Sequence, residues 1–340
     1  MVRPVTIDLT TLRQVEFAVT NARMGEHRMD VYVSRRIPEL SRSLVQRLIK
    51  DGLVLVNGKR TKASASPLKG DRIEVQCPLI IEPQTRAEDI PLNIVYEDDD
   101  IVVINKTPNF VVHPACGHWE GTLVNALLHH CGSLAPTDDI YRPGIVHRLD
   151  KDTSGVIIAA KTVRAHGNLT NQFENRTVEK EYVAIVDGEL RFDRDVIVKP
   201  IGRHPRDREK MAVRKDDGKP AETFYEVKER FRDFTFVRCA PKTGRTHQIR
   251  VHLLSIGHPI VADSLYGRKD ALFEWELKYP QRPMELEQGE PLIDRHALHA
   301  ASIRFDHPKT GERVFFEAPL ADDMRRTVEA LREWRGPRAG

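Results

Sequence analysis

Apolar residues near the N-terminus repeat at the spacing of a helix. Met29, Val33 and Ile37 lie four residues apart, which predicts a helix that ends before Pro38. The next segment, SRSLVQRLIKDG (41–52), predicts a second helix with a serine N-cap and a glycine stop. LVLVNGKRTK then predicts two short strands joined by an Asn-Gly hairpin. This pattern indicates a small domain of two helices and short strands.

Strand patterns dominate the chain beyond residue 91. NIVYEDDDIVVINK predicts two strands around an acidic turn, VIIAA a buried strand, and KEYVAIV and QIRVHL two further strands. Helical patterns are fewer: GTLVNALLHH with its cap near Thr122, VRAHGNLTNQFENR and DDMRRTVEALREW. These patterns predict a large, β-rich second domain.

The predicted elements divide the chain into four parts. Residues 1–22 show no strong pattern and are expected to form a loosely held leader. Residues 23–75 form the small domain, and 76–91 resemble a linker because they hold three prolines and little periodicity. Residues 92–335 form the large domain.

Composition and charge place the protein among ordinary globular chains with one basic segment. Of 340 residues, 40% are hydrophobic and 30% charged, and the net charge is only +3. Between Arg23 and Val75, however, 12 Lys and Arg face 6 Asp and Glu, a local charge of +6. Basic charge gathered on one small domain is typical of a phosphate-binding module.

Targeting and cysteine patterns indicate the compartment. No signal peptide opens the chain, and no apolar stretch approaches the 18 residues of a membrane span. The four cysteines form no CxxC pair, so we expect reduced thiols and no zinc ribbon. These features predict a cytoplasmic protein that does not enter a membrane, and we expect a monomer.

One segment carries the strongest chemical signal, GIVHRLDKDTSGVIIAAKT (144–162). It places Asp150 between a polar turn and an apolar strand, with Arg148 two residues before it. A carboxylate at the mouth of a buried strand is a candidate nucleophile. A nearby guanidinium would keep it ionised, and TGRTHQIRVH supplies Arg245 and Arg250. If QIRVHL is a strand, Gln248 and Arg250 share a face.

This segment and three others, in the same order, resemble the pseudouridine synthases of the RluA/RluD type, which isomerise uridine in ribosomal RNA. The resemblance spans residues 23–335 and is strongest for the RluD-like subgroup, which modifies a stem-loop of large-subunit ribosomal RNA. It implies an α+β fold: a mixed, mostly antiparallel catalytic sheet behind a small RNA-binding domain. It also implies a reaction without redox cofactor, nucleotide or metal. The four segments are 144–162, 180–190, 243–267 and 296–308.

The resemblance gives three residues a part in catalysis. Asp150 matches the family's essential aspartate, and Arg250 matches its cationic partner. Tyr182 matches the tyrosine that stacks on the target uracil and is a candidate for removing its C5 proton. Structural alternatives stay open: an Asx turn at Asp150, for which Asp152 is the better candidate, a core tyrosine, and a surface ion pair or phosphate contact at Arg250.

Three further residues are candidates for binding the substrate. By resemblance, Arg148 corresponds to the arginine that helps to extrude the target nucleotide, a step that costs a few kcal/mol of stacking. Leu298 resembles the apolar residue that walls the base pocket, and Arg245, on the turn before QIRVHL, is a candidate substrate contact. The structural alternatives are a turn arginine, core packing and a surface ion pair.

The small domain resembles the RNA-binding fold named after the small-subunit ribosomal protein S-four. SRSLVQRLIKDGLVLVNGKRTK carries this resemblance. We expect its second helix and hairpin to contact RNA phosphates, with a solvated helix face as the structural alternative. The candidate RNA-binding residues are Arg42, Arg47, Lys50, Lys59 and Arg60.

Two other functions remain as alternatives. A non-catalytic RNA-binding factor for ribosome assembly would keep the basic domain but would not need the aspartate, arginine and tyrosine together. A metal-dependent RNA hydrolase would need a cluster of ligands. His247 and His252 are the nearest candidates, and on a strand they would point to opposite faces, so we predict no metal site.

Overall fold

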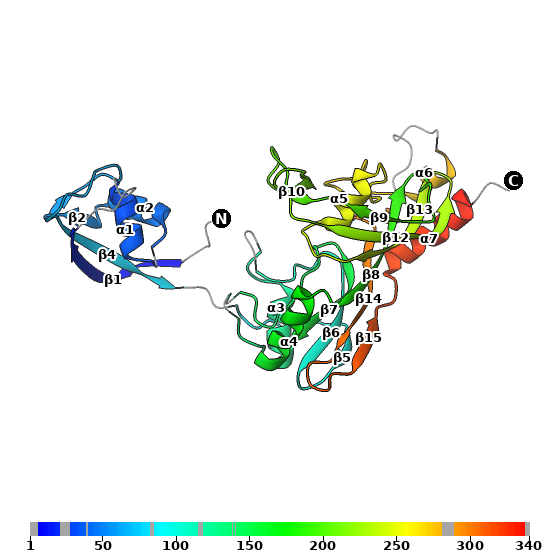
Figure 1. Ribbon diagram of the computed structural model, residues 1–340, viewed down its shortest axis with the longest axis horizontal. Coiled ribbons are helices and arrows are strands. Elements are labelled where there is room, and N and C mark those ends of the chain that lie inside the picture. The colour runs from blue at the N-terminus through cyan, green and yellow to red at the C-terminus, as the bar shows by residue number, and fades with distance from the viewer. Residues whose placement is uncertain are drawn as a thin grey trace. The chain divides into compact units, whose positions relative to one another are not determined.

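The chain folds into two units, at residues 1–84 and 85–340, each with its own core (Figure 1). The computed structural model describes residues 6–20, 28–38, 40–81, 85–114, 118–137, 139, 141–280 and 289–336. No helix in these ranges combines the length and the apolar character that crossing a membrane requires.

The N-terminal unit has the two predicted helices, α1 (Met29–Arg36) and α2 (Arg42–Asp51). The predicted cap of α2 is confirmed, because the Ser41 side chain accepts a hydrogen bond from the Leu44 amide. Gly52 ends the helix in a left-handed conformation at φ +79°. The guanidinium of Arg60 lies across this glycine, so close that a Cβ there would meet it at 2.6 Å.

The sheet of this unit corrects the prediction of a leader. Residues Thr6–Ala18 form strand β1, which pairs along its length with β4 (Arg72–Ile81). The strand alternates as a half-buried strand should, with Val15 and Phe17 packed on the core and their neighbours exposed. Residues 1–5 and 21–22 of the predicted leader lie outside the described residues. The full order is β1–β4–β2–β3, with β2 at Val54–Val56 and β3 at Lys59–Arg60.

The predicted linker was also placed too early. Strand β4 continues through residue 81, so the first six residues of 76–91 belong to the sheet. The register of β1 against β4 shifts between the Leu12–Pro78 and Asp8–Leu79 pairs. Proline fits a sheet at such an irregularity, because it cannot donate a ladder hydrogen bond. A proline therefore marked a bulge and not the end of the strand.

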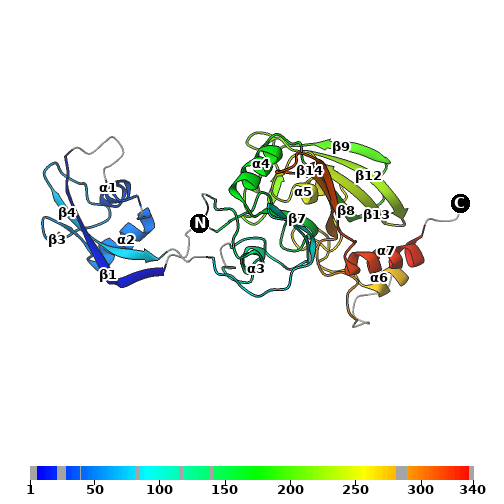
Figure 2. The same ribbon diagram turned by 90° about the horizontal axis from the view of Figure 1, so that it is seen from below.

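The described residues of the second unit form a nine-stranded sheet with α-helices packed against it (Figures 1 and 2). Its order is β5–β6–β7–β14–β8–β13–β12–β9, and β15 pairs with β14. The β7–β14 pair is parallel and the other pairs are antiparallel, which confirms a mixed, mostly antiparallel sheet. The strands are β5 (Ile94–Glu97), β6 (Ile101–Lys106), β7 (Ser154–Ala160), β8 (Glu179–Asp187), β9 (Arg194–Val198), β12 (Glu222–Phe231), β13 (Phe234–Pro241), β14 (Leu298–Asp306) and β15 (Arg313–Glu317).

All three helices predicted for this unit are present. Thr122 caps α3 as expected, with its hydroxyl facing the Asn125 amide. Helices α6 and α7 pack together near the end of the chain (Figure 2). A small pair of strands, β10 (Ile201–Arg203) and β11 (Met211–Val213), lies apart from the main sheet. The helices are α3 (Leu123–Cys131), α4 (Val163–Glu174), α5 (Gln248–Ser255), α6 (Glu274–Lys278) and α7 (Asp322–Arg335).

The prediction of a strand at QIRVHL is wrong, because this segment is helix α5. All six residues from 248 to 253 are buried, the polar ones included, so polar and apolar positions do not separate into two faces and the helix shows no amphipathic period. In the helix, Gln248 and Arg250 point to different partners and do not share a face. Gln248 bonds to Thr243, whereas Arg250 reaches Asp150.

Candidate active site

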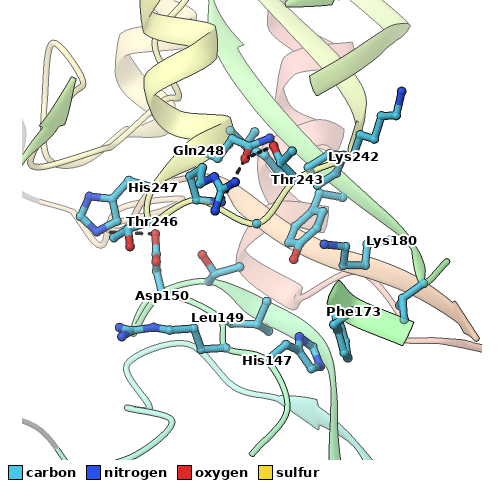
Figure 3. A pocket seen from close by; sticks show the side chains of 18 of the residues that line it. His147, Leu149, Asp150, Phe173, Lys180, Lys242, Thr243, Thr246, His247 and Gln248 are labelled. Atoms are coloured by element: carbon cyan, nitrogen blue, oxygen red, sulfur yellow. Dashed lines mark hydrogen bonds and ion pairs between the residues drawn. The ribbon is translucent and has the colours of Figure 1, made fainter. Parts of the chain in front are cut away.

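A cavity of about 500 Å³ opens between the loop before β7, strand β8 and the turn before α5 (Figure 3). It brings together residues that lie far apart in the sequence. All six residues predicted for the catalytic domain line it: Arg148, Asp150, Tyr182, Arg245, Arg250 and Leu298.

Two buried cations hold the loop that carries Asp150. Lys106 donates to the backbone carbonyl of Lys151 and to two further carbonyls, within 3.0 Å. Arg295 donates to the carbonyl of Asp152 at 2.8 Å. Because both contacts go to main-chain carbonyls, they fix the backbone of the two residues that follow Asp150. Sequence reasoning did not identify either cation.

The glycine of DTSG is required by the packing of β7. Gly155 has φ +107° and pairs in parallel with Ala300 of β14. A Cβ at this position would lie 2.1 Å from the Ala300 carbonyl oxygen, so any side chain there would clash with the backbone. The glycine of this turn signature therefore allows β7 and β14 to approach closely where the loop of Asp150 enters β7.

Arg250 bridges two carboxylates. Its Nη1 donates to Asp150 Oδ2 at 3.0 Å, and its Nε and Nη2 donate to Asp263 at 2.7 Å each. Asp263 is fully buried and also accepts the amides of Leu265 and Tyr266. The two-pronged contact with Asp263 fixes the guanidinium plane, so the third contact aims at Asp150. Sequence reasoning missed Asp263, although ADSLYG places a carboxylate in an apolar setting.

The net effect of this environment is an ionised Asp150. Burial alone would raise the pKa of Asp150. At the acidic pH where this carboxyl titrates, the charges of protonated His247 and of Arg250 outweigh burial and bring the pKa below its usual value. Burial lowers the pKa of His247, so its imidazole is uncharged at neutral pH. Arg250 is then the cation that keeps the carboxylate ionised.

Hydrogen bonding sets the orientation of His247. The Tyr266 hydroxyl accepts the Met211 amide at 2.7 Å and lies 2.8 Å from Nδ1 of His247. This contact leaves Nε2 facing Asp150 Oδ2 at 3.9 Å.

Tyr182 and Leu298 form the wall of the cavity next to Asp150. They lie on the paired strands β8 and β14, and Leu298 is buried. Burial, and then the charge of Asp150, raise the pKa of Tyr182. Its hydroxyl therefore stays protonated, which suits stacking and hydrogen-bond donation better than proton removal.

Gln248 shapes the turn on the other side of the cavity. Its amide oxygen accepts from the Thr243 hydroxyl at 2.6 Å and the Arg245 amide at 3.0 Å. Its amide nitrogen donates to the Glu222 carbonyl and the Thr223 hydroxyl, at 2.9 Å each. The side chain of Arg245 donates to a backbone carbonyl, that of Pro220, so a structural contact already engages it.

The segment before Asp150 combines one fixed and one unengaged side chain. His147 accepts the Ile158 amide at 3.0 Å and stacks on Phe173, with ring centroids 4.7 Å apart. Arg148 is exposed and forms no ion pair or hydrogen bond with any described residue. It is therefore available to a ligand of the cavity that it lines.

In the N-terminal unit the five predicted RNA-binding residues are all exposed but not equivalent. Arg42 donates to the fully buried Asp30 at 3.1 Å, and Arg47 lies 3.8 Å from Asp51. Arg60 covers Gly52. Lys50 and Lys59 have no ion pair within the described part of the unit and are the two ammonium groups most available to phosphate.

One group with the ligand types of a metal site lies in the described residues, away from the cavity. Glu97, His130 and Cys131 place one ligand atom each within 4.8 Å of the others. Lys161 already pairs with the Glu97 carboxylate at 2.7 Å, and burial raises the pKa of the Cys131 thiol. Both features oppose cation binding, and the predicted candidates His247 and His252 do not belong to this group.

Comparison with known proteins identifies both units. Residues 100–255 match the RNA pseudouridylate synthase family, and residues 28–73 match the S4 domain family. The chain is 43% identical to a Bacillus subtilis protein named "Uncharacterized RNA pseudouridine synthase YlyB", over 95% of this chain and 99% of that protein. It is 44% identical to the "Ribosomal large subunit pseudouridine synthase D" of Vibrio parahaemolyticus, over 93% and 94%.

Solved structures agree. "Human RNA Pseudouridylate Synthase Domain Containing 4" aligns with a TM-score of 0.53 and 26% identity, over 71% of this chain and 93% of that chain. "Human RNA Pseudouridylate Synthase Domain Containing 1" aligns with a TM-score of 0.51 and 27% identity, over 76% and 100%. The chain therefore belongs to the RluD-type RNA pseudouridine synthases and is an RNA-modifying isomerase with an S4 domain ahead of its catalytic domain.

Proposed function

We propose that the protein converts specific uridines to pseudouridine in a stem-loop of 23S large-subunit ribosomal RNA. The observation that carries the chemistry is the Asp150 carboxylate, ionised by Arg250 at 3.0 Å and facing a cavity large enough for a nucleotide. The printed names of relatives such as the Vibrio protein support ribosomal RNA as the substrate.

In this proposal, each of the cavity residues Arg148, Tyr182 and Asp150 acts at a different step of the reaction. Arg148, exposed and unengaged at the cavity mouth, takes the place of the extruded nucleotide in the RNA stack. Tyr182 stacks on the uracil against Leu298, and its protonated hydroxyl donates a hydrogen bond. Asp150 acts at the sugar when the bond from C1′ to N1 breaks. The uracil then turns and rejoins C1′ through C5, and the C5 proton is lost.

Release of tritium from C5-labelled uridine tests this function. Large-subunit RNA transcribed without modification is incubated with the protein, with no added metal or nucleotide. We expect stoichiometric release, and sequencing of the product should place pseudouridine within one stem-loop. Release from transfer RNA but not from ribosomal RNA would reject the proposed substrate while keeping the activity. RNA binding without release from either would favour an assembly factor.

Affinity should depend on the two available lysines of the S4 domain. Replacing Lys50 and Lys59 together by glutamine removes two unpaired charges. Each lost phosphate contact should flatten the plot of log affinity against log salt by about 0.7 to 0.9. Affinity should fall at low salt, and the single-turnover rate at saturating protein should not change. Arginine at both positions is the matched control and should retain the wild-type slope. An unchanged slope in the glutamine variant would contradict a phosphate role.

A further inference from the structure

A second cationic side chain, Lys180, points into the cavity from strand β8 (Figure 3). It lies two residues before Tyr182, and alternation along a strand puts both on the same face. Its Nζ is 5.8 Å from the centre of the Phe173 ring. A Cβ built on Gly244, across the cavity, would lie 4.0 Å from the same atom. Lys180 therefore stands beside the predicted stacking position of the uracil.

Lys180 is unusual because its ammonium has no counter-ion among the described residues. It forms no ion pair or hydrogen bond with the described residues, whereas Lys106 has three carbonyls and Lys161 has Glu97. Burial lowers the pKa of Lys180 to about 8, so it is still mostly protonated at neutral pH. The other ionisable groups in the lining of the cavity are His147, Arg148, Glu174, Arg176, Tyr182, Lys242, Arg245, His247, Arg250 and Asp150, whose carboxylate is held by Arg250.

None of those groups neutralises Lys180. His147 is uncharged, because burial lowers the pKa of its imidazole to about 3. Lys242 is exposed and pairs with Glu222 at 3.3 Å, and both Glu174 and Arg176 are exposed to solvent. Arg250, the other buried cation of the cavity, already has two carboxylates. A half-buried ammonium without a counter-ion thus remains available to a substrate anion.

The isomerisation creates such an anion. When the bond between C1′ and N1 breaks, its electron pair goes to the uracil, and the charge spreads over N1, O2 and O4. This holds whether Asp150 adds to C1′ or removes a proton from C2′. A fixed cation in a site that excludes water stabilises a developing charge far more than one in bulk solvent.

We propose, building on the function above, that protonated Lys180 stabilises the negative charge that develops on the uracil as it leaves C1′. Lys180 keeps its proton throughout, and the C5 proton is lost to another acceptor after the new bond forms. It would be a catalytic residue of this reaction beside Asp150. Its contribution is electrostatic and therefore belongs to the bond-breaking step and not to RNA affinity.

Lys180→Met tests this role. Its single-turnover rate at saturating protein should fall about 10²- to 10³-fold, with RNA affinity unchanged within a factor of about two. Lys180→Arg retains the charge and should recover most of the rate. Lys228→Met, on an exposed position of β12, is the matched control and should not differ from wild type. Thermal unfolding distinguishes a catalytic role of Lys180 from a structural one. Methionine removes an unpaired buried charge, so the unfolding midpoint of Lys180→Met should not fall.

The pH profile distinguishes this role from general base catalysis. If the ammonium is the active form, kcat/KM should fall as pH rises through about 8, the pKa of Lys180, and the fall should move to higher pH in Lys180→Arg. A rate that rises through this pH would show that the neutral amine acts as a base and would overturn the proposal. So would a Lys180→Met rate within threefold of wild type. The assay uses whichever RNA the wild type modifies, so a wrong substrate proposal does not affect the comparison.

Discussion

Asp150→Asn should abolish tritium release while leaving RNA binding intact. Asparagine has nearly the same shape but cannot add to the sugar as a carboxylate or accept its proton. Loss of the group that forms the reacting bond lowers the rate of other enzymes by about 10⁴-fold or more, and we expect a loss of this size. Single-turnover release from large-subunit RNA measures it directly.

The control for this prediction is the next carboxylate in the loop. Asp152 offers only its backbone carbonyl to Arg295, and Asp152→Asn keeps that carbonyl. We therefore expect near wild-type rates from Asp152→Asn. Both variants should unfold within a few degrees of wild type, since the contacts of Lys106 and Arg295 go to the main chain. Equal losses in the two variants would mean that loop structure, and not the Asp150 carboxylate, accounts for the effect.

Local sequence patterns predicted an element correctly where its side chains interact with residues close to them in the chain. The Ser41 cap and Gly52 stop of α2 depend on neighbouring backbone atoms, so the sequence predicted both ends. The apolar run after Asp150 predicted β7 because every residue of this strand is buried. The six candidate site residues meet in one cavity, although Arg250 lies on an element whose type the pattern predicted wrongly.

The missed features depend on partners that are distant in the chain. Strand β1 alternates visibly at Val15 and Phe17, but its partner β4 extends through Pro78, which local rules read as a break. Helix α5 buries polar and apolar residues alike from 248 to 253, and this hides its period. Asp263 gains its role only because the fold brings it to Arg250, and the carbonyls that hold Lys106 are set by the loops around it. No period or spacing encodes such contacts.

The contacts of Arg250 with two carboxylates predict the effect of removing its charge on stability and activity. Arg250→Gln would leave Asp150 and the fully buried Asp263 without their shared counter-ion. Removing one partner of a buried pair costs about 3 to 5 kcal/mol, and we expect a loss of stability of this size in chemical denaturation. Activity at pH 7 should fall by about 10²- to 10³-fold, in line with the loss of one preorganised charge at a reacting group.

The sign of the pH dependence gives the sharper test of Arg250. In the wild type the pKa of Asp150 lies below its usual value, so the carboxylate is ionised and active throughout the neutral range. Without Arg250, burial dominates and raises this pKa, so the activity of Arg250→Gln should increase with pH through the neutral range. The ionisation of Asp150 also affects folding stability. Because the folded-state pKa of Asp150 is lowered, its contribution to stability is present above the unfolded-state pKa and is lost as pH falls through the folded-state pKa.

Asp263→Asn separates the charge of Arg250 from its position. This variant keeps the guanidinium beside Asp150 but loses one of the two bonds of 2.7 Å that orient it, because an amide has a single acceptor oxygen. We expect a fall of about 10- to 100-fold in rate, typical of removing the residue that orients a catalytic group. Its pH profile should remain flat near neutrality, because the cation is still present. A flat profile in Arg250→Gln as well would show that His247, whose Nε2 lies 3.9 Å from Asp150, keeps the carboxylate ionised instead.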